Sequence, residues 1–101
     1  MSGTFLLEDQ TTNTTGNQSV LKIENTANFA KWYNLYAHGI WDGATIITKI
    51  SPDEGTTWDE AGEYTTFTQN GGGRLLLNPG FLVRGDLSDA GALTNLNLKI
   101  F

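Results

Sequence analysis

Short stretches in which apolar and polar residues alternate constrain the fold of this chain more than any other feature. Alternation of this kind places successive side chains on opposite faces of an extended strand. The clearest examples are residues 44–50, which are rich in β-branched side chains, and residues 95–100, where Leu96, Leu98 and Ile100 alternate with polar residues. No stretch of about eleven or more residues has the apolar period of a helix. The pattern predicts an all-β chain.

Turn-forming residues separate these stretches at a spacing of roughly ten residues, which is typical of β-sandwiches and small barrels. Asp42-Gly43 and Asn78-Pro79-Gly80 are the clearest turns. A chain of 101 residues holds a single core. We therefore expect one small antiparallel β-sandwich or barrel of seven to eight strands over residues 19–101. The remaining expected segments are strands at 19–23, 29–40, 64–68, 74–77 and 81–84, a flexible turn at Gly71-Gly72-Gly73 and a polar connection at 86–91.

The first eighteen residues differ in composition from the rest. Residues 3–8 are long enough for a short strand, and the uncharged polar stretch after them has no apolar side chain to bury. We expect residues 1–18 to form an extended N-terminal arm, which is either a flexible lead-in or a segment that becomes ordered on a neighbouring protein. In the second case Phe5, Leu6 and Leu7 form its apolar, capsid-binding anchor.

The charge balance and the absence of cysteine exclude several kinds of partner and chemistry. Six basic residues against eleven acidic ones give a net charge of −5, which disfavours binding to nucleic acid through a basic surface. Without cysteine there are no disulfides, thiolate ligands or thiol nucleophiles. The longest apolar runs are far shorter than a membrane span. We expect neither a nucleic acid nor a membrane as partner.

Few side chains are suited to catalysis or to metal binding. His38 is the only histidine, so a nucleophile, base and orienting group are not available together. The glycine run lacks the Lys-Ser/Thr of a phosphate-binding loop. Acidic residues near one turn could hold calcium, but their spacing is not that of an EF-hand. We predict a protein that is not an enzyme, with no cofactor, no metal site and a solvated acidic turn at Asp53, Glu54, Asp59 and Glu60.

The most specific motif is S-x-D-x-G-x-T-W, which residues 51–58 match at every defined position. We expect a hairpin in which the Asp53 side chain accepts a hydrogen bond from the backbone two residues on. Gly55 supplies a positive φ, and the hydroxyls of Ser51 and Thr57 satisfy the loop backbone or pair across it. Trp58 is expected to fold under the turn, close the end of the core and donate its indole N–H to a carbonyl.

This motif resembles the Asp-box hairpin of sialidases and related β-propellers. In those families the hairpin lies on the outside of a blade, so the resemblance implies a turn and not an activity. The chain has one copy of the motif and is too short for a ring of four blades. Only Arg74 and Arg84 are available where a sialidase uses three arginines. We therefore do not expect sialidase activity.

Residues 39–101 also resemble small virion proteins of tailed bacteriophages. The resemblance rests on the glycine turn, the β-rich strand, the hairpin, the segments 81–84 and 87–91, and the alternating strand at the end. It implies a head decoration (cement), fibre or tail accessory protein. We expect a non-enzymatic structural protein located on the virion, most simply a capsid decoration protein. Its expected partners are the major capsid protein and further copies of itself, with a trimer as the predicted assembly.

The segment 29–40 is dense in aromatic residues and has apolar side chains on both faces when extended. Trp32 and Tyr36 share one face with His38, and Trp41 follows the segment. These three aromatic residues, Trp32, Tyr36 and Trp41, are suited to a core, to a subunit interface or to a platform on which sugar rings stack. The last possibility gives the alternative function, a carbohydrate-binding module of a tail or fibre protein.

Overall fold

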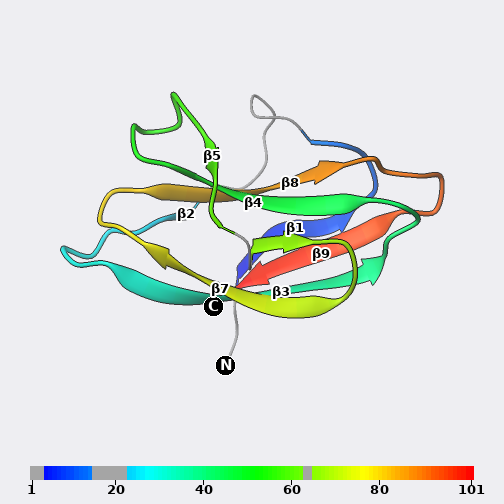
Figure 1. Ribbon diagram of the computed structural model, residues 1–101, viewed down its shortest axis with the longest axis horizontal. Coiled ribbons are helices and arrows are strands. Elements are labelled where there is room, and N and C mark those ends of the chain that lie inside the picture. Colours follow the sequence, from blue (N-terminus) through cyan, green and yellow to red (C-terminus); the bar gives the residue numbers. More distant parts are fainter. Residues whose placement is uncertain (1–3, 15–22, 63–64) are drawn as a thin grey trace.

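Two antiparallel sheets face each other across one apolar core in the computed structural model, which describes residues 4–14, 23–62 and 65–101 (Figure 1). The first sheet has the strand order β1-β9-β3-β7, and the second has the order β2-β8-β4-β5, with β6 also paired to β4. The predicted all-β sandwich is confirmed. The strands are β1 (Thr4–Gln10), β2 (Ile23–Glu24), β3 (Lys31–Ile40), β4 (Thr45–Ser51), β5 (Asp59–Glu60), β6 (Thr66–Phe67), β7 (Gly71–Leu77), β8 (Leu82–Ser88) and β9 (Asn95–Ile100).

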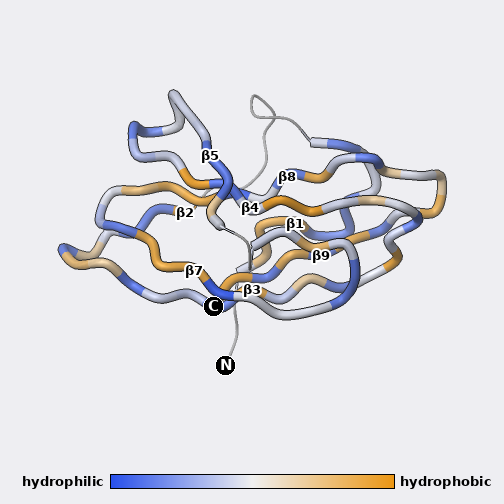
Figure 2. Tube along the Cα trace, viewed as in Figure 1, coloured by the Kyte–Doolittle hydropathy of each residue, from blue (hydrophilic) through white to orange (hydrophobic). Residues whose placement is uncertain are grey.

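The core is built from one face of each long strand, as alternation requires, except in β1, where a register shift lets the consecutive Leu6 and Leu7 both be buried. On β9 the buried residues are Leu96, Leu98 and Ile100, and on β3 they are Leu35 and Ala37. Figure 2 shows hydrophobic stretches along β4 and β7, whereas the hairpin between β4 and β5 is largely hydrophilic. The other members of the core are Leu6, Leu7, Ala44, Ile46, Phe67, Leu75, Leu77, Val83 and Leu87.

The described part of the expected arm belongs to the sandwich. Strand β1 pairs with β9 at the edge of the first sheet, and Leu6 and Leu7 are each only 2% exposed. These two leucines are held in the chain's own core, so they do not form an exposed capsid-binding anchor. Phe5 is half-buried, with the Lys99 ammonium 5.7 Å from the centre of its ring. Residues 1–3 and 15–22 of the expected arm and first strand lie outside the described residues.

Two expectations about loops are wrong because strand pairing overrides local composition. The glycine run was expected to be a flexible turn, but Gly71-Gly72-Gly73 begins β7 and pairs with residues 35–37 of β3. The polar connection was expected to start at Asp86, but β8 continues to Ser88 and pairs with β4 along its whole length. The expected strand at 64–68 is shorter than predicted, since only Thr66–Phe67 form β6 while Thr65 and Thr68 lie outside it; residue 64 lies outside the described residues.

Both predicted turns are confirmed by their backbone geometry. Asp42 and Gly43 have φ angles of 46° and 85°, and the Ala44 N–H donates to the Trp41 carbonyl at 2.9 Å, as in a type I′ hairpin turn. At Asn78-Pro79-Gly80, the positive φ of the glycine and the hydrogen bond that closes the turn define type II. Each turn reverses the chain tightly at an end of the sandwich.

The first sheet packs closely on Gly85 of β8 in the second sheet. A Cβ atom at this position would lie 2.8 Å from Leu98 Cδ2 and 3.3 Å from Leu7 Cγ, and both leucines are buried. The absence of a side chain at residue 85 therefore lets β1 and β9 pack directly on β8.

We predict that Gly85→Ala lowers the free energy of unfolding by about 1–3 kcal/mol through overpacking of the core. Gly71→Ala is the matched control, because a Cβ there would meet only the Gln69 carbonyl oxygen, at 3.9 Å. Chemical denaturation of both variants measures the difference. Equal stability of the two variants would contradict the close approach at Gly85.

Candidate functional site

The hairpin over residues 51–58 is held by hydrogen bonds among its own residues. Ser51 Oγ donates to Asp53 Oδ1 at 2.8 Å and accepts from the Gly55 N–H at 2.8 Å. Asp53 accepts from the Thr57 N–H at 2.8 Å and from the Thr57 hydroxyl at 2.7 Å. Gly55 has the expected positive φ, 93°. The carboxylate therefore accepts from the backbone four residues on and not two, because the turn brings Thr57 back over it.

These hydrogen bonds favour the charged form of Asp53. The hydroxyl and the N–H of Thr57 hold the pKa of the Asp53 carboxyl below its ordinary value of 3.8. The carboxylate is exposed, yet each of its two oxygens accepts a hydrogen bond from Thr57. Both carboxylate oxygens of Asp53 are therefore used to hold the turn closed.

Trp58 fixes the hairpin to the second sheet in a way that the sequence did not indicate. Its indole N–H donates to the Gly55 carbonyl at 3.0 Å, as predicted. Its ring does not close the end of the core. The Arg84 guanidinium lies 4.1 Å from the ring centre, on the face of β8 opposite to Val83 and Leu87. Trp58 therefore covers a buried cation on the outer face of the second sheet.

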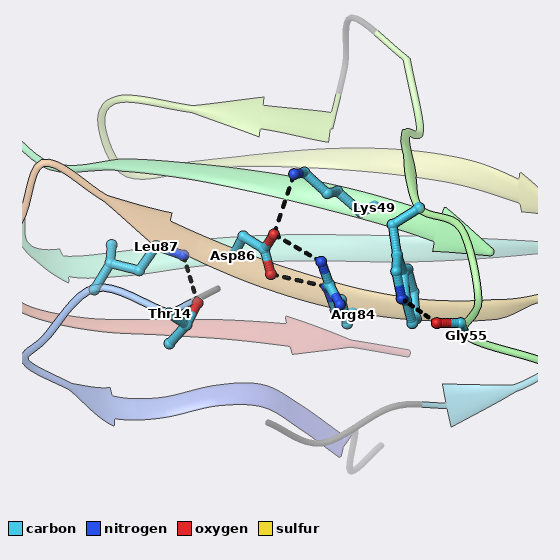
Figure 3. Close-up of polar contacts among 7 residues, drawn as sticks. Thr14, Lys49, Gly55, Arg84, Asp86 and Leu87 are labelled. Carbon is cyan, nitrogen blue, oxygen red and sulfur yellow. Dashed lines mark hydrogen bonds and ion pairs between the residues drawn. The ribbon is translucent and has the colours of Figure 1, made fainter. Parts of the chain in front are cut away.

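The buried cation belongs to a charged cluster, formed by Arg84, Asp86 and Lys49 (Figure 3). Arg84 Nε lies 2.9 Å from Asp86 Oδ1, and Lys49 Nζ lies 3.3 Å from Asp86 Oδ2. Arg84 is 2% exposed and Asp86 7%. The sequence analysis missed this cluster, although an arginine and an aspartate two residues apart on a strand share a face.

The hairpin and the charged cluster are joined through the contact between Trp58 and Arg84. Among residues 4–14, 23–62 and 65–101, no group of three or more His, Cys, Asp and Glu side chains is placed to hold a metal ion. Within the same residues, no helix is both long and apolar enough to cross a membrane. The Asp53 carboxylate serves hydrogen bonds of the turn, and Arg84, Asp86 and Lys49 form ion pairs, whereas Glu54, Asp59 and Glu60 are exposed.

The outer face of the first sheet is the more exposed candidate site. Trp32 is 64% exposed and Tyr36 44%, and both side chains leave the face of β3 opposite to the buried Leu35. Leu76 lies opposite Trp32 in the strand register and is 45% exposed. Apolar and aromatic side chains therefore project from the outer face of the first sheet. Neither of the two described sheets packs on this face.

A groove of about 760 Å³ lies on this face beside the edge strand β7. Tyr36 and Phe101 are among its walls, and the glycine pair Gly72-Gly73 opens space for it because it carries no side chains. Among the described residues that line the groove, only Arg74 is charged, and its guanidinium lies 5.3 Å from the centre of a Trp32 ring. The groove thus combines aromatic rings with one cation.

The three aromatic residues predicted to act together are divided by the fold. Trp32 and Tyr36 lie on the exposed face, whereas Trp41 is half-buried and packs against the core. The Trp41 indole N–H donates to Asn70 Oδ1 at 2.8 Å, which fixes the ring at the end of β3. His38 is stacked on Tyr36, with ring centres 5.2 Å apart. The expected surface platform therefore lacks Trp41 and includes His38.

Comparison with known proteins gives no match: no family model, no curated protein and no solved structure is significantly similar to the chain.

We predict that Asp53→Asn reduces the acid sensitivity of the fold. Because the folded-state pKa of Asp53 lies below the unfolded one, its stabilising effect is complete above about pH 4 and is lost as the pH falls through the lowered pKa. The difference in melting temperature between the wild-type protein and Asp53→Asn should therefore shrink below pH 4. Asp59→Asn, a change at an exposed carboxylate on β5, is the control. A difference that is independent of pH would contradict this role of Asp53.

We predict that Asp86→Ala lowers the free energy of unfolding by about 3 kcal/mol, because it removes the carboxylate that faces a buried guanidinium. Lys49→Ala is the control. The Lys49 side chain is 29% exposed, so its loss should cost less than about 1 kcal/mol. Urea denaturation measures both free energies of unfolding. Equal losses in the two variants would show that the buried pair of Arg84 and Asp86 stabilises the fold no more than the partly exposed Lys49 does.

Proposed function

We propose that this chain is a non-enzymatic structural protein of a bacteriophage virion, and that it attaches to other virion proteins through the outer face of the first sheet. The observation that carries the proposal is the exposure of Trp32, Tyr36 and Leu76 on one face of a domain that has a core of its own. Exposed apolar patches mark interaction sites, and Trp and Tyr are enriched in protein interfaces. On the head, the partner is the major capsid protein.

The attachment works by burying apolar surface. Each Å² of apolar area removed from water contributes about 25 cal/mol to the stability of the contact. The sequence analysis assigned this role to Phe5, Leu6 and Leu7, but Leu6 and Leu7 are already buried within the domain. The proposal therefore moves the attachment surface from the N-terminal segment to the aromatic side chains of β3.

The phage assignment itself draws on the resemblance of residues 39–101 to small virion proteins. The geometry of the 51–58 hairpin supports it, because all the residues of the motif act within the turn or against β8, and none is left for a substrate. A hairpin whose residues only stabilise the fold is consistent with a structural role for the protein. Location on the virion and assembly as a trimer remain predictions from the resemblance.

We expect the protein to be present in purified phage particles from a lysate of cells that carry its gene, and antibody labelling in electron microscopy to place it on the head. In a binding assay with those particles, Trp32→Ala and Tyr36→Ala should each reduce attachment by roughly tenfold or more, as interface aromatics do. Leu93→Ala, at another exposed apolar residue, is the control. Absence of the protein from the particles would overturn the proposal.

A second candidate function is favoured by the groove beside Tyr36. Aromatic rings on the outer face of the sheet can stack against sugar rings, and Asn34 and Arg74 at the same groove can form hydrogen bonds with sugar hydroxyls. The same variants distinguish it: binding on a glycan array, lost in Trp32→Ala and Tyr36→Ala at unchanged melting temperature, would select a carbohydrate-binding module over a decoration protein.

A further inference from the structure

Strand β7 has a long and regular outer edge, unlike the other strands at the borders of the described sheets. It pairs with β3 through seven consecutive residues without a bulge, and no described strand pairs with its other side. Strand β1 is interrupted by two register shifts, and β2, β5 and β6 have two residues each. Bulges and short length are the usual ways in which sheet edges are protected from pairing. The edge of β7 has neither.

One end of this edge is already occupied. Asn25 is 1% exposed, and its side-chain amide donates to the Leu77 carbonyl at 2.8 Å. The last residue of β7 is therefore closed by the loop after β2. Any strand that is added to β7 must pair with the part that begins at Gly71.

The outer face of β7 is complementary to itself. Gly72 and Arg74 are both exposed and lie two residues apart, so their positions share this face. If a second copy pairs antiparallel with β7 and the two-fold axis passes through Gly73, Gly72 of each copy lies directly opposite Arg74 of the other. The groove beside Gly72 then receives an arginine from the second copy, next to the Tyr36 ring.

We propose that two copies of this chain pair edge to edge through β7, antiparallel and centred on Gly73, with each Arg74 inserted beside Tyr36 of the other copy. A guanidinium on an aromatic ring is a favourable contact, and the added strand satisfies backbone groups at the edge. Each first sheet then continues into the other, giving one sheet of eight strands.

Other registers of the same pairing are disfavoured by named residues. A pair centred on Arg74 would place the two arginines directly opposite each other, which is destabilising for like charges. A pair centred on Leu75 would need Leu77, whose carbonyl is bound by Asn25. The outward residues of β3 and β7 include no carboxylate. The acidic residues that give each copy its net charge of −5 therefore do not lie on the outer face of these two strands.

The backbone pairing concerns the edge of β7 and does not rest on the proposed attachment to a virion, although the inserted Arg74 lies beside Tyr36, which also belongs to the proposed attachment face. A two-fold contact closes with two copies, so this pairing by itself gives a dimer and not the trimer expected from the resemblance. The dimer would present the exposed aromatic faces of two copies side by side.

The first test is the mass of the full chain in solution, measured by sedimentation equilibrium. We expect about 22 kDa, twice the 11.0 kDa of one chain. Arg74→Glu should raise the dissociation constant at least tenfold. Lys99→Glu, the same charge reversal on β9 of the same sheet, should change it less than about twofold. A mass of one or three copies, or equal effects of the two variants, would overturn the proposal.

The second test fixes the register and uses the absence of cysteine from the sequence. Residues directly opposite in an antiparallel pair are close enough for a disulfide. Under oxidation, an equal mixture of Gly72→Cys and Arg74→Cys should form a cross-linked dimer, whereas neither variant alone should do so. Cross-linking of Arg74→Cys alone, or none in the mixture, would exclude pairing centred on Gly73. Neither test depends on where the protein is found in a particle.

Discussion

Each sheet has two faces and the chain has one core, so alternation along the strands decides which residues remain outside. On β3 the buried set is Leu35 and Ala37, which leaves Trp32 and Tyr36 exposed. On β8 the buried set is Val83 and Leu87, which forces Arg84 and Asp86 to the opposite face. The exposed aromatic face and the charged cluster are thus two results of the same constraint.

The outer faces of the two sheets differ in how far the chain itself covers them. On the second sheet, Trp58 covers Arg84, so the outer face is partly closed by the chain's own hairpin. On the first sheet, the glycines at the start of β7 leave space beside Tyr36. A protein that stabilises one outer face internally and leaves the other aromatic and open has an obvious side for a partner. This asymmetry is the physical basis of the proposed attachment surface.

Local sequence predicted the parts of the fold in which local rules are sufficient. Strands β4 and β9 and the turns at Asp42-Gly43 and Asn78-Pro79-Gly80 follow from alternation and turn chemistry. The start of β7 could not be predicted, because three glycines have little strand preference and become a strand only through pairing with β3. The burial of Leu6 and Leu7 depends on β9, which lies about ninety residues further along the chain.

The candidate site was predicted in its composition but not in its contacts. The motif predicted which residues form the hairpin. It did not predict the contact of Trp58 with Arg84, because Arg84 lies on another strand and is brought there by tertiary packing. The sequence placed Trp32 and Tyr36 on one face of β3. It could not say which face is exposed, since both faces carry apolar side chains.

The position of β9 has a consequence for synthesis on the ribosome. It is the last of the described strands to be made, yet it lies in the first sheet between β1 and β3, and these two strands meet only through it. Until residue 100 has left the exit tunnel, the nascent chain lacks the middle of that sheet, and Leu6 and Leu7 have no completed interior to enter. Completion of the first sheet therefore waits for the last of the described strands, which pairs with the first of them.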